Sequence, residues 1–550
     1  MTICNIGSMI GALADRYARW GPASPSHAPD PRAADYIVEV LGPASPTAPV
    51  ALSEVQPRPS RLDSAAAAAL ASAVGEQHVH TDREGRLAHA GGLSYTDLLD
   101  RRTQRRPEVP DAVVSPGSHD EVVALLAAAG RCGVTLVPFG GGTSVVGGVR
   151  PDGGTRSAVV AISFDRMAEL LDVDQVSGTA RVQPGMTGPA LERLLEARGL
   201  TWGHVPQSWE RATIGGYAAT RSAGQSSTGY GRSDATVQAI VVATPRGTLR
   251  LGRAPSSAAG PDLRALFLGS EGALGVITEV TLRVRRLPST RWFEAVMFPD
   301  LDAGVAAFRE LAQARASADV MRLSDLAETR ATLRMSGPTG RAAQAVDGYL
   351  KVRRVTDGCM AILGWDGSSA GQVRARRSMA FGILRRHGAA TLGRGAGRSW
   401  LRHRFEGPYL RDTLMDRGYL VETLETATSW SELATLRESV AGALSDSLGR
   451  SYVMSHVSHV YETGASLYLT ALASAGPDQA DRWRAAKDAA SEVIVASGAT
   501  ITHHHGIGSD HSPWLDAEVG PAGVGLLRAV KAHLDPDGIL NPGVLLPAPE

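Results

Sequence analysis

Three consecutive histidines, His503, His504 and His505, precede a Gly506-Ile507-Gly508 turn near the end of the chain. Imidazoles bind transition metals and exchange protons near neutral pH, so this run could be a metal site, part of an active site, or a surface loop. Zinc sites usually show a partnered H-E-x-x-H or cysteine set, and no such set occurs nearby. If the run is a strand, His503 and His505 face one side and His504 the other. We therefore expect no metal here.

A second chemical feature is a set of three glycine-rich loops, each associated with a predicted strand. The first is Gly140-Gly141-Gly142-Thr143-Ser144, directly after the strand pattern "VTLVPF". The others contain Gly215-Gly216 with Ser222-Ala223-Gly224, and "GSEGALGVIT" at 269–278. The first loop is neither a GxGxxG turn nor a P-loop, and no single loop is specific, so each alone could also be a plain turn. Together they could enclose a large polyphosphate ligand, because small residues let backbone N–H groups approach phosphate closely.

Helices and strands alternate around these loops, which indicates an α+β fold. Ser118 or Asp120 can cap a helix that Gly133 ends, and the first glycine loop follows the next strand. From residue 290 to 470 the glycine loops are absent and helical patterns alternate with short strands such as "YVMSHVSHV". This change predicts a second domain after the loop-bearing one.

Composition excludes several classes of protein. The chain of 550 residues carries 56 basic and 56 acidic residues, so no overall field attracts nucleic acid. Its three cysteines, Cys4, Cys132 and Cys359, show no paired spacing, which is typical of a reducing cytoplasm. We find no signal-peptide pattern and no apolar run long enough to cross a bilayer. We expect a cytoplasmic protein, with peripheral membrane contact left open.

The loop sequences "PFGGGTS", "TRSAG" and "GSEGALGVIT", with the terminal "LDPDGILNPG", resemble the FAD-binding fold of the vanillyl-alcohol oxidase superfamily. In that fold two α+β lobes hold FAD and a cap domain covers the flavin. The segments "ITHHHGIG", "YLRD", "ETLETATSW", "HVYETGASLY" and "MRLSD" are similar to the alkyldihydroxyacetonephosphate synthase family within it. Related D-2-hydroxyacid dehydrogenases typically carry a single histidine in an E-H-G-I-G context, so the histidine run favours the synthases.

The resemblance implies four parts of the chain. Residues 1–80 would be a partly disordered, then helical extension, and 81–290 the two-lobed FAD-binding domain. Residues 291–500 would form an α+β cap for the substrate, and 501–550 would return to the flavin.

The resemblance also implies which residues hold FAD. A histidine beside the first glycine loop, which tethers FAD covalently in many superfamily members, is absent here. We therefore expect non-covalent FAD. The matching positions are Pro138, Phe139, Gly140, Gly141, Gly142, Thr143, Ser144, Gln207, Ser208, Thr213, Thr220, Arg221, Ser222, Ala223, Glu271, Gly272, Ala273, Leu274, Gly275, Val276 and Ile277.

Catalytic roles carry over from the family in the same way. Tyr468 matches the tyrosine that takes the substrate C1 proton, and Arg322 an arginine required for activity. His503, His504 and His505 match the three family histidines. Arg411 matches a substrate-binding arginine, and His204 a family histidine before the second FAD segment.

Simpler readings stand beside these roles. Tyr468 could be a core residue of a buried strand. Arg411 could pair with Asp412 or Glu406, and Arg322 with Asp325.

The implied reaction exchanges the acyl group of acyl-dihydroxyacetone phosphate for a long-chain fatty alcohol, through an adduct at flavin N5, in ether lipid synthesis. The alternatives are an FAD-dependent D-2-hydroxyacid dehydrogenase or oxidase, and a flavin-binding protein without catalysis. A homodimer is expected. The chain departs from the family at Ala427, where serine is common, and at Gln207, which is typically acidic; both changes could reshape the substrate end of the pocket.

Overall fold

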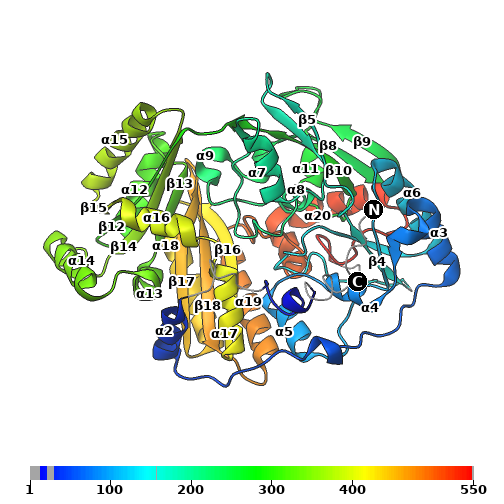
Figure 1. The fold of residues 1–550 in the computed structure, drawn as a ribbon, viewed down its shortest axis with the longest axis horizontal. Coiled ribbons are helices and arrows are strands. Elements are labelled where there is room, and N and C mark those ends of the chain that lie inside the picture. Colours follow the sequence, from blue (N-terminus) through cyan, green and yellow to red (C-terminus); the bar gives the residue numbers. More distant parts are fainter. Residues whose placement is uncertain (1–12, 22–29, 157, 548–550) are drawn as a thin grey trace.

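The computed structural model describes residues 13–21, 30–156 and 158–547 (Figure 1). The expected disorder in the N-terminal extension falls partly on residues 1–12 and 22–29, which lie outside the described residues, as does Cys4. Cys132 and Cys359 are both free thiols.

The first glycine loop belongs to a small, mostly parallel sheet with the strand order β1-β2-β4-β3. Helix α6 (His119–Cys132) packs on it, starting at Ser118, whose hydroxyl accepts from the Glu121 N–H at 3.1 Å. Gly133 ends the helix in the left-handed conformation, φ 65°. These predicted boundaries are confirmed because the capping hydroxyl and the glycine are local signals. The strands are β1 (Val79–His80), β2 (Ala112–Val114), β4 (Val159–Ser163) and β3 (Thr135–Phe139), and the second helix of this lobe is α3 (Ser64–Val74).

The other two glycine loops belong to a five-stranded antiparallel sheet with the order β5-β6-β10-β8-β9. Its apolar face and helices α7 and α8 share one core that includes Val182, Leu191, Ile214 and Val280. The elements are β5 (Leu170–Asp174), β6 (Thr179–Val182), β10 (Val276–Arg283), β8 (Val237–Thr244), β9 (Gly247–Leu251), α7 (Gly188–Glu196) and α8 (Ile214–Thr220), with a two-stranded ribbon of β7 (Leu200–Thr201) and β11 (Arg285–Arg286) and short helices α9 (Ser227–Tyr230), α10 (Ser233–Thr236) and α11 (Arg264–Phe267).

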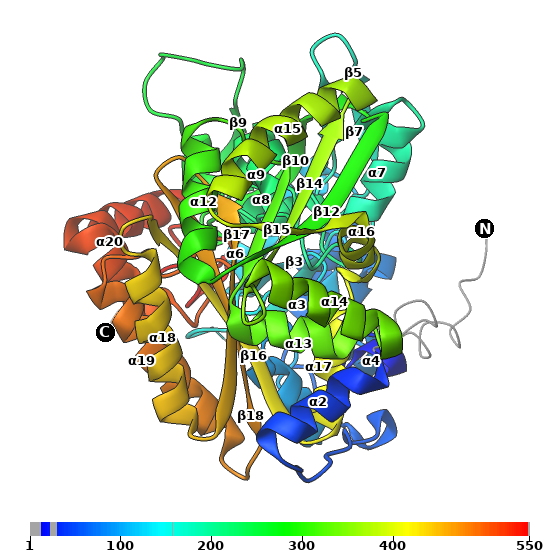
Figure 2. The same cartoon turned by 90° about the vertical axis from the view of Figure 1, so that its left-hand side faces the viewer.

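A seven-stranded antiparallel sheet, in the order β15-β12-β14-β13-β17-β18-β16, forms the other side of the molecule (Figure 1). Helices α12, α15, α18 and α19 contribute to its main core, and α18 and α19 lie next to each other (Figure 2). The strands are β15 (Ala390–Leu392), β12 (Thr290–Phe298), β14 (Cys359–Gly367), β13 (Val320–Ser324), β17 (Ser451–Val460), β18 (Gly464–Ser474) and β16 (Tyr419–Ser429). The helices are α12 (Leu301–Gln313), α13 (Leu326–Ser336), α14 (Gly340–Arg353), α15 (Ala370–Arg386), α16 (Gly393–His403), α17 (Gly407–Asp416), α18 (Leu433–Leu448) and α19 (Gln479–Ala496).

N-terminal residues also pack against this sheet. Helix α2 (Pro31–Leu41) buries Ile37 and Leu41 against Leu414 and Tyr419. Helices α4 (Arg83–Ala88) and α5 (Tyr95–Thr103) follow, and the backbone N–H of Tyr95 donates to the Glu422 carboxylate of β16. The early chain therefore joins the two sides of the molecule.

The C-terminal residues return to the glycine loops after α20 (Leu515–Leu534). Leu540 pairs with Leu136 of β3, and the Asn541 amide donates to the carbonyls of Gly148 (3.0 Å) and Glu271 (2.7 Å). The mixed α+β fold predicted from the sequence is confirmed. Among the described residues, no helix has the length and apolar character that crossing a bilayer requires.

Candidate active site

The histidine run is held by one buried carboxylate, Glu425 of β16. The backbone N–H groups of His503, His504 and His505 donate to its two oxygens at 2.8, 3.0 and 2.9 Å. The Thr502 hydroxyl adds a fourth bond at 2.6 Å. The run is therefore a bent loop, and the strand-like alternation considered from the sequence is wrong, because the three N–H groups converge on one acceptor.

The Glu425 side chain is completely buried. Burial alone would raise its pKa, but His504, together with His505 and His503, holds it well below its ordinary value. The donated N–H groups favour the ionised form in the same direction. Glu425 is thus a buried anion around which the loop is shaped.

The three imidazoles have different surroundings. His503 lies within 2.7 Å of the Tyr461 hydroxyl through Nε2, and its carbonyl accepts from Arg232 at 2.9 Å. His504 Nδ1 lies 3.3 Å from Glu425. Burial, the largest cause, lowers the pKa of His503 and of His505 to about 3, so both rings are neutral near pH 7.

Tyr468 lies in the middle of this group, because β18 runs between β16 and β17. Its register partners are Glu425 on one side and His456 on the other. The His456 ring stacks on it at 4.9 Å between centroids, and the rings of His504 and His505 lie 6.1 and 5.6 Å away. Burial raises the pKa of Tyr468 to about 12, so the phenol is protonated at neutral pH.

Arg322 is linked to Tyr468 through His456, whose ring stacks on the phenol. Its guanidinium pairs with Glu328 and lies 3.0 Å from His456 Nε2, while Glu328 lies 3.0 Å from His456 Nδ1. Although burial would raise the pKa of Glu328, Arg322 and His456 lower it to about 2. The ion-pair partner of Arg322 is therefore Glu328 rather than Asp325, which binds Ser455 instead.

Arg411 on α17 retains donors for a ligand. One guanidinium N–H donates to the Leu93 carbonyl at 2.8 Å, and Leu93 N–H in turn donates to the Ser144 carbonyl of the first glycine loop. Its Nε is buried and, among the described residues, has no hydrogen-bond partner. An unpaired buried N–H on a cation fits an anionic ligand, since leaving it unpaired is costly.

His204 lies within the flavin lobe rather than in the histidine cluster. It is 2% exposed, between the rings of Trp202 and Tyr217, and its Nε2 lies 3.2 Å from the Ser222 hydroxyl. Its position suits support of Ser222, one of the predicted FAD residues. Direct substrate contact by His204 stays a prediction.

The three glycine loops meet in space. A Cβ on Gly140 would collide with the Thr213 hydroxyl, and one on Gly141 with the Arg211 carbonyl. A Cβ on Gly272, which has φ 81°, would lie 2.7 Å from Pro138. Close backbone approach therefore requires glycine at all three positions.

This arrangement fits the diphosphate of a dinucleotide cofactor. Among the described residues, the N–H groups of residues 141–145 donate no hydrogen bond, and the loop is only partly buried. A series of free backbone N–H groups forms a natural anion site. Pro138, Phe139 and Thr143 complete that loop, whereas the Ser144 hydroxyl is occupied by the Gly148 N–H at 3.0 Å.

The remaining predicted FAD residues differ in what their side chains contact. The Arg221 side chain binds the carbonyls of Leu268 and Ala265, and Thr220 binds the Gly216 carbonyl, so their side chains act within the lobe. Glu271 reaches the histidine loop, where its Oε2 accepts from Gly508 N–H at 2.7 Å. Burial raises the pKa of Glu271 to about 7. Gln207, Ser208, Ser222 and Ala223, and residues 273–277, remain predictions as FAD contacts.

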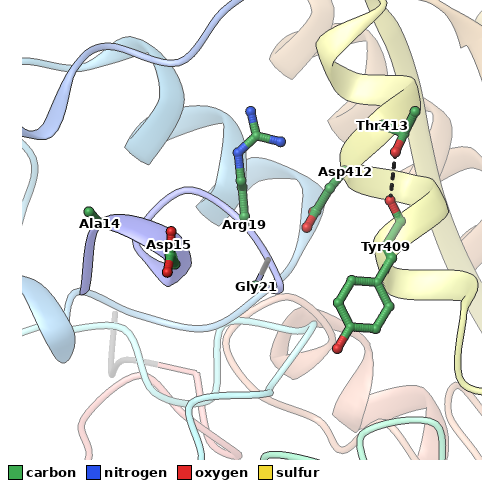
Figure 3. A pocket seen from close by; sticks show the side chains of 7 residues that line it. All are labelled: Ala14, Asp15, Arg19, Gly21, Tyr409, Asp412 and Thr413. Atoms are coloured by element: carbon green, nitrogen blue, oxygen red, sulfur yellow. Dashed lines mark hydrogen bonds between the residues drawn. The ribbon is translucent and has the colours of Figure 1, made fainter. Parts of the chain in front are cut away.

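A cavity of about 290 Å³ lies beside α17 (Figure 3). Arg19 and other residues of the N-terminal segment face Tyr409, Asp412 and Thr413 across it. None of the predicted site residues lines this cavity, so it is separate from the candidate site.

Sequence reasoning missed several polar residues of the site: Glu425, Glu328, His456, His459 and Tyr461. Glu425 lies in the quoted segment "ETLETATSW", where a charge inside an apolar strand was a usable signal. His456 and His459 are three apart, which places them on opposite faces of a regular strand. A register shift between Val457 and Val460 interrupts that alternation, and no sequence pattern shows it.

Comparison with known proteins gives the class first. The model for FAD binding domains matches residues 110–252, and that for the C-terminal domain of FAD linked oxidases matches residues 287–545. The chain is therefore a flavoprotein enzyme with FAD as its cofactor, as the glycine loops indicate.

The family follows from individual relatives. The alkyldihydroxyacetonephosphate synthase of Trypanosoma brucei brucei is 32% identical over 87% of this chain and 80% of its own length. A solved alkyldihydroxyacetonephosphate synthase structure superimposes with a TM-score of 0.81, at 28% identity, over 93% of this chain and 92% of its own. The glycolate oxidase subunit of Bacillus subtilis (strain 168) is more distant, at 27% identity over 83% of this chain and 92% of its own length. The chain belongs to the alkyldihydroxyacetonephosphate synthase family.

Proposed function

We propose that the protein exchanges the acyl group of acyl-dihydroxyacetone phosphate for a long-chain alcohol, the ether-forming step of ether lipid synthesis. The observation that carries this proposal is the packing of the three-histidine loop around Tyr468, beside the junction of the glycine loops. FAD, when bound, supplies an electron-rich centre for a ketone-bearing fragment whose carboxylate has left. Binding is proposed to be non-covalent.

The residues then have separate tasks. Arg411 binds the phosphate through its spare donors, since a guanidinium matches phosphate oxygens well. Tyr468 accepts the C1 proton at its hydroxyl oxygen. Because burial keeps the phenol protonated, its own proton must leave as it accepts another. The neutral imidazole of His505, whose ring centroid lies 5.6 Å from that of Tyr468, is proposed to take it, with the His504 ring beside it.

Arg322 is proposed to act through His456, whose ring it holds against Tyr468. His503, bound to Tyr461 and to Arg232, supports the loop. The proposal also includes the division of the chain into four parts, a homodimer and a cytoplasmic location. It further includes peripheral membrane contact, which would suit long-chain substrates.

The test is an exchange assay with the FAD-loaded protein, acyl-dihydroxyacetone phosphate and a labelled long-chain alcohol. Labelled ether product with released fatty acid is expected from the wild type, and not from Tyr468→Phe with flavin still bound. The second candidate is oxidation of a D-2-hydroxy acid, favoured only by similarity to the glycolate oxidase subunit. Rapid flavin bleaching by such acids without ether product would replace the first proposal by the second.

A further inference from the structure

A second set of contacts in the histidine cluster includes His459, which has no task in the proposed exchange reaction. His459 of β17, His503 and His504 each offer one ring nitrogen as a possible ligand, and these three nitrogens lie within 4.8 Å of one another. The rings pack closely: His459 stacks on His503 at 5.1 Å and meets His504 edge-on at 5.1 Å. His459 and His503 are 5% and 8% exposed.

Within this group one ring nitrogen of His459 has no hydrogen-bond partner among the described residues, and His503 and His504 share one hydrogen bond. Where His503 Nε2–H donates to the Tyr461 oxygen 2.7 Å away, its Nδ1 carries a lone pair. That Nδ1 then accepts a hydrogen bond from His504 Nδ1–H at 3.0 Å, and a bound cation would displace this shared proton. His459 Nδ1 is fully buried and has no hydrogen-bond partner among the described residues. A buried polar nitrogen without a partner is costly, so this position indicates a missing ligand.

We propose that His459, His503 and His504 bind one borderline divalent cation of the zinc type. Three neutral imidazoles are a common ligand set for such ions, with metal–nitrogen distances of about 2.0–2.1 Å. The three ring nitrogens already lie within 4.8 Å of one another. Small rotations of the rings would let all three reach one ion placed between them at that metal–nitrogen distance. The Glu425 carboxylate, 3.3 Å from His504 Nδ1, supplies negative charge beside the ion.

Tyr461 orients His503 by a hydrogen bond, as residues hydrogen-bonded to metal-binding histidines usually do. Its hydroxyl holds the far nitrogen of His503 and so fixes which ring nitrogen faces inward. His505 is not part of the set and remains beside Tyr468. The expectation of no metal relied on a linear motif, whereas these ligands come from a strand and a distant loop. The site rests on this geometry and not on the exchange reaction.

The test uses tag-free, FAD-loaded protein that has been treated with a chelator and dialysed. Zinc is titrated in by calorimetry, bound metal is measured by mass spectrometry, and cobalt substitution is followed by its visible ligand-field bands. Wild type should bind one ion per chain. His459→Ala should weaken binding at least about a hundredfold, and Tyr461→Phe about tenfold. His403→Ala, which changes an exposed histidine of α16, is the matched control and should bind as wild type does.

Flavin absorbance and thermal unfolding show whether each variant is folded. If His459→Ala fails to fold, His459→Gln replaces it, and anomalous diffraction at the zinc edge from wild-type crystals locates the ion directly. Absence of stoichiometric binding, equal affinity in folded His459→Ala, or an anomalous peak elsewhere would each overturn the proposal. The exchange assay is not a readout here, so failure of the metal site and failure of the synthase function are distinguishable.

Discussion

The flavin side of the candidate site and the cap side are built in different ways. On the flavin side, glycines bring backbone N–H groups together, and residues 141–145 offer them without using a side chain. On the cap side, Glu425, Tyr468, His456 and Arg322 form a layer of side chains across neighbouring strands. A site built from backbone N–H groups accepts many side chains around it, except at the close-contact glycines, where a Cβ would collide with the neighbouring loop. The cap side depends instead on charged side chains and on strand register. The difference predicts which kinds of substitution each side withstands.

The largest effect is expected on the cap side, from Glu425→Gln. The amide keeps the shape but removes the anion that receives three backbone N–H groups and a hydroxyl. Breaking such a buried ionic network should cost about 3–5 kcal/mol of unfolding free energy. The exchange rate kcat/KM should fall by on the order of 10³, since the histidine loop loses its shape. Denaturant unfolding and the exchange assay measure the two quantities.

Glu422→Gln is the matched control, because Glu422 is a buried carboxylate of the same strand that holds Tyr95 instead of the histidines. It should destabilise the protein and leave the geometry of the histidine loop intact. Equal losses of activity in both variants at equal stability would contradict the special position of Glu425.

On the flavin side, the corresponding change is Gly141→Ala. The added methyl group would collide with the Arg211 carbonyl, so the first and second glycine loops must separate. FAD affinity should fall at least about a hundredfold, or about 3 kcal/mol. Flavin content after gel filtration and fluorescence titration of FAD measure this loss.

Gly382→Ala in α15 is the matched control, because a Cβ there meets no atom within 4 Å. It should retain FAD fully, and the better helix propensity of alanine should leave stability unchanged or slightly higher. Normal FAD binding by Gly141→Ala would show that the loops do not need their close backbone contact.

The two sides also differ in how far the sequence predicts them. The glycine loops, the Ser118 cap and the Gly133 helix end are local signals, so the flavin lobe could be predicted from short segments. The cap cluster required register: Glu425 and Tyr468 are neighbours only because β16 and β18 pair at those positions. Glu328 as the partner of Arg322 follows from the start of α13 after β13, where Asp325 is used as the cap instead. Such competition between two nearby carboxylates is decided by three-dimensional packing.

Glu328→Gln separates charge from packing within the cap. Glu328 is ionised at all working pH values, since Arg322 and His456 lower its pKa to about 2. The amide should cost about 2–3 kcal/mol by leaving Arg322 without its anion. In a double-mutant cycle with Arg322→Lys, the coupling energy should be about 2 kcal/mol. Additive effects of the two changes would contradict the ion pair.

The smallest predicted effect lies where the two sides touch, at Glu271. Its carboxyl group receives Gly508 N–H from the histidine loop, and burial raises its pKa from 4.5 to about 7. The folded state therefore binds a proton more tightly than the unfolded state does. The resulting stabilisation is complete below pH 4.5 and is lost as the pH rises toward 7. Between about pH 5 and 7 the unfolding free energy should fall by about 2 kcal/mol on this account.

Glu271→Gln cannot titrate, so this part of the pH dependence should disappear, while Glu196→Gln, an exposed change on α7, should leave it in place. Urea unfolding at several pH values compares the three proteins. If the unfolding free energy of Glu271→Gln depends on pH as that of the wild type does, another group causes the pH dependence. The contact between the flavin and cap sides would then not depend on protonation of Glu271. A lost slope would show that the proton bound by Glu271 in the folded state stabilises the protein where the two sides touch.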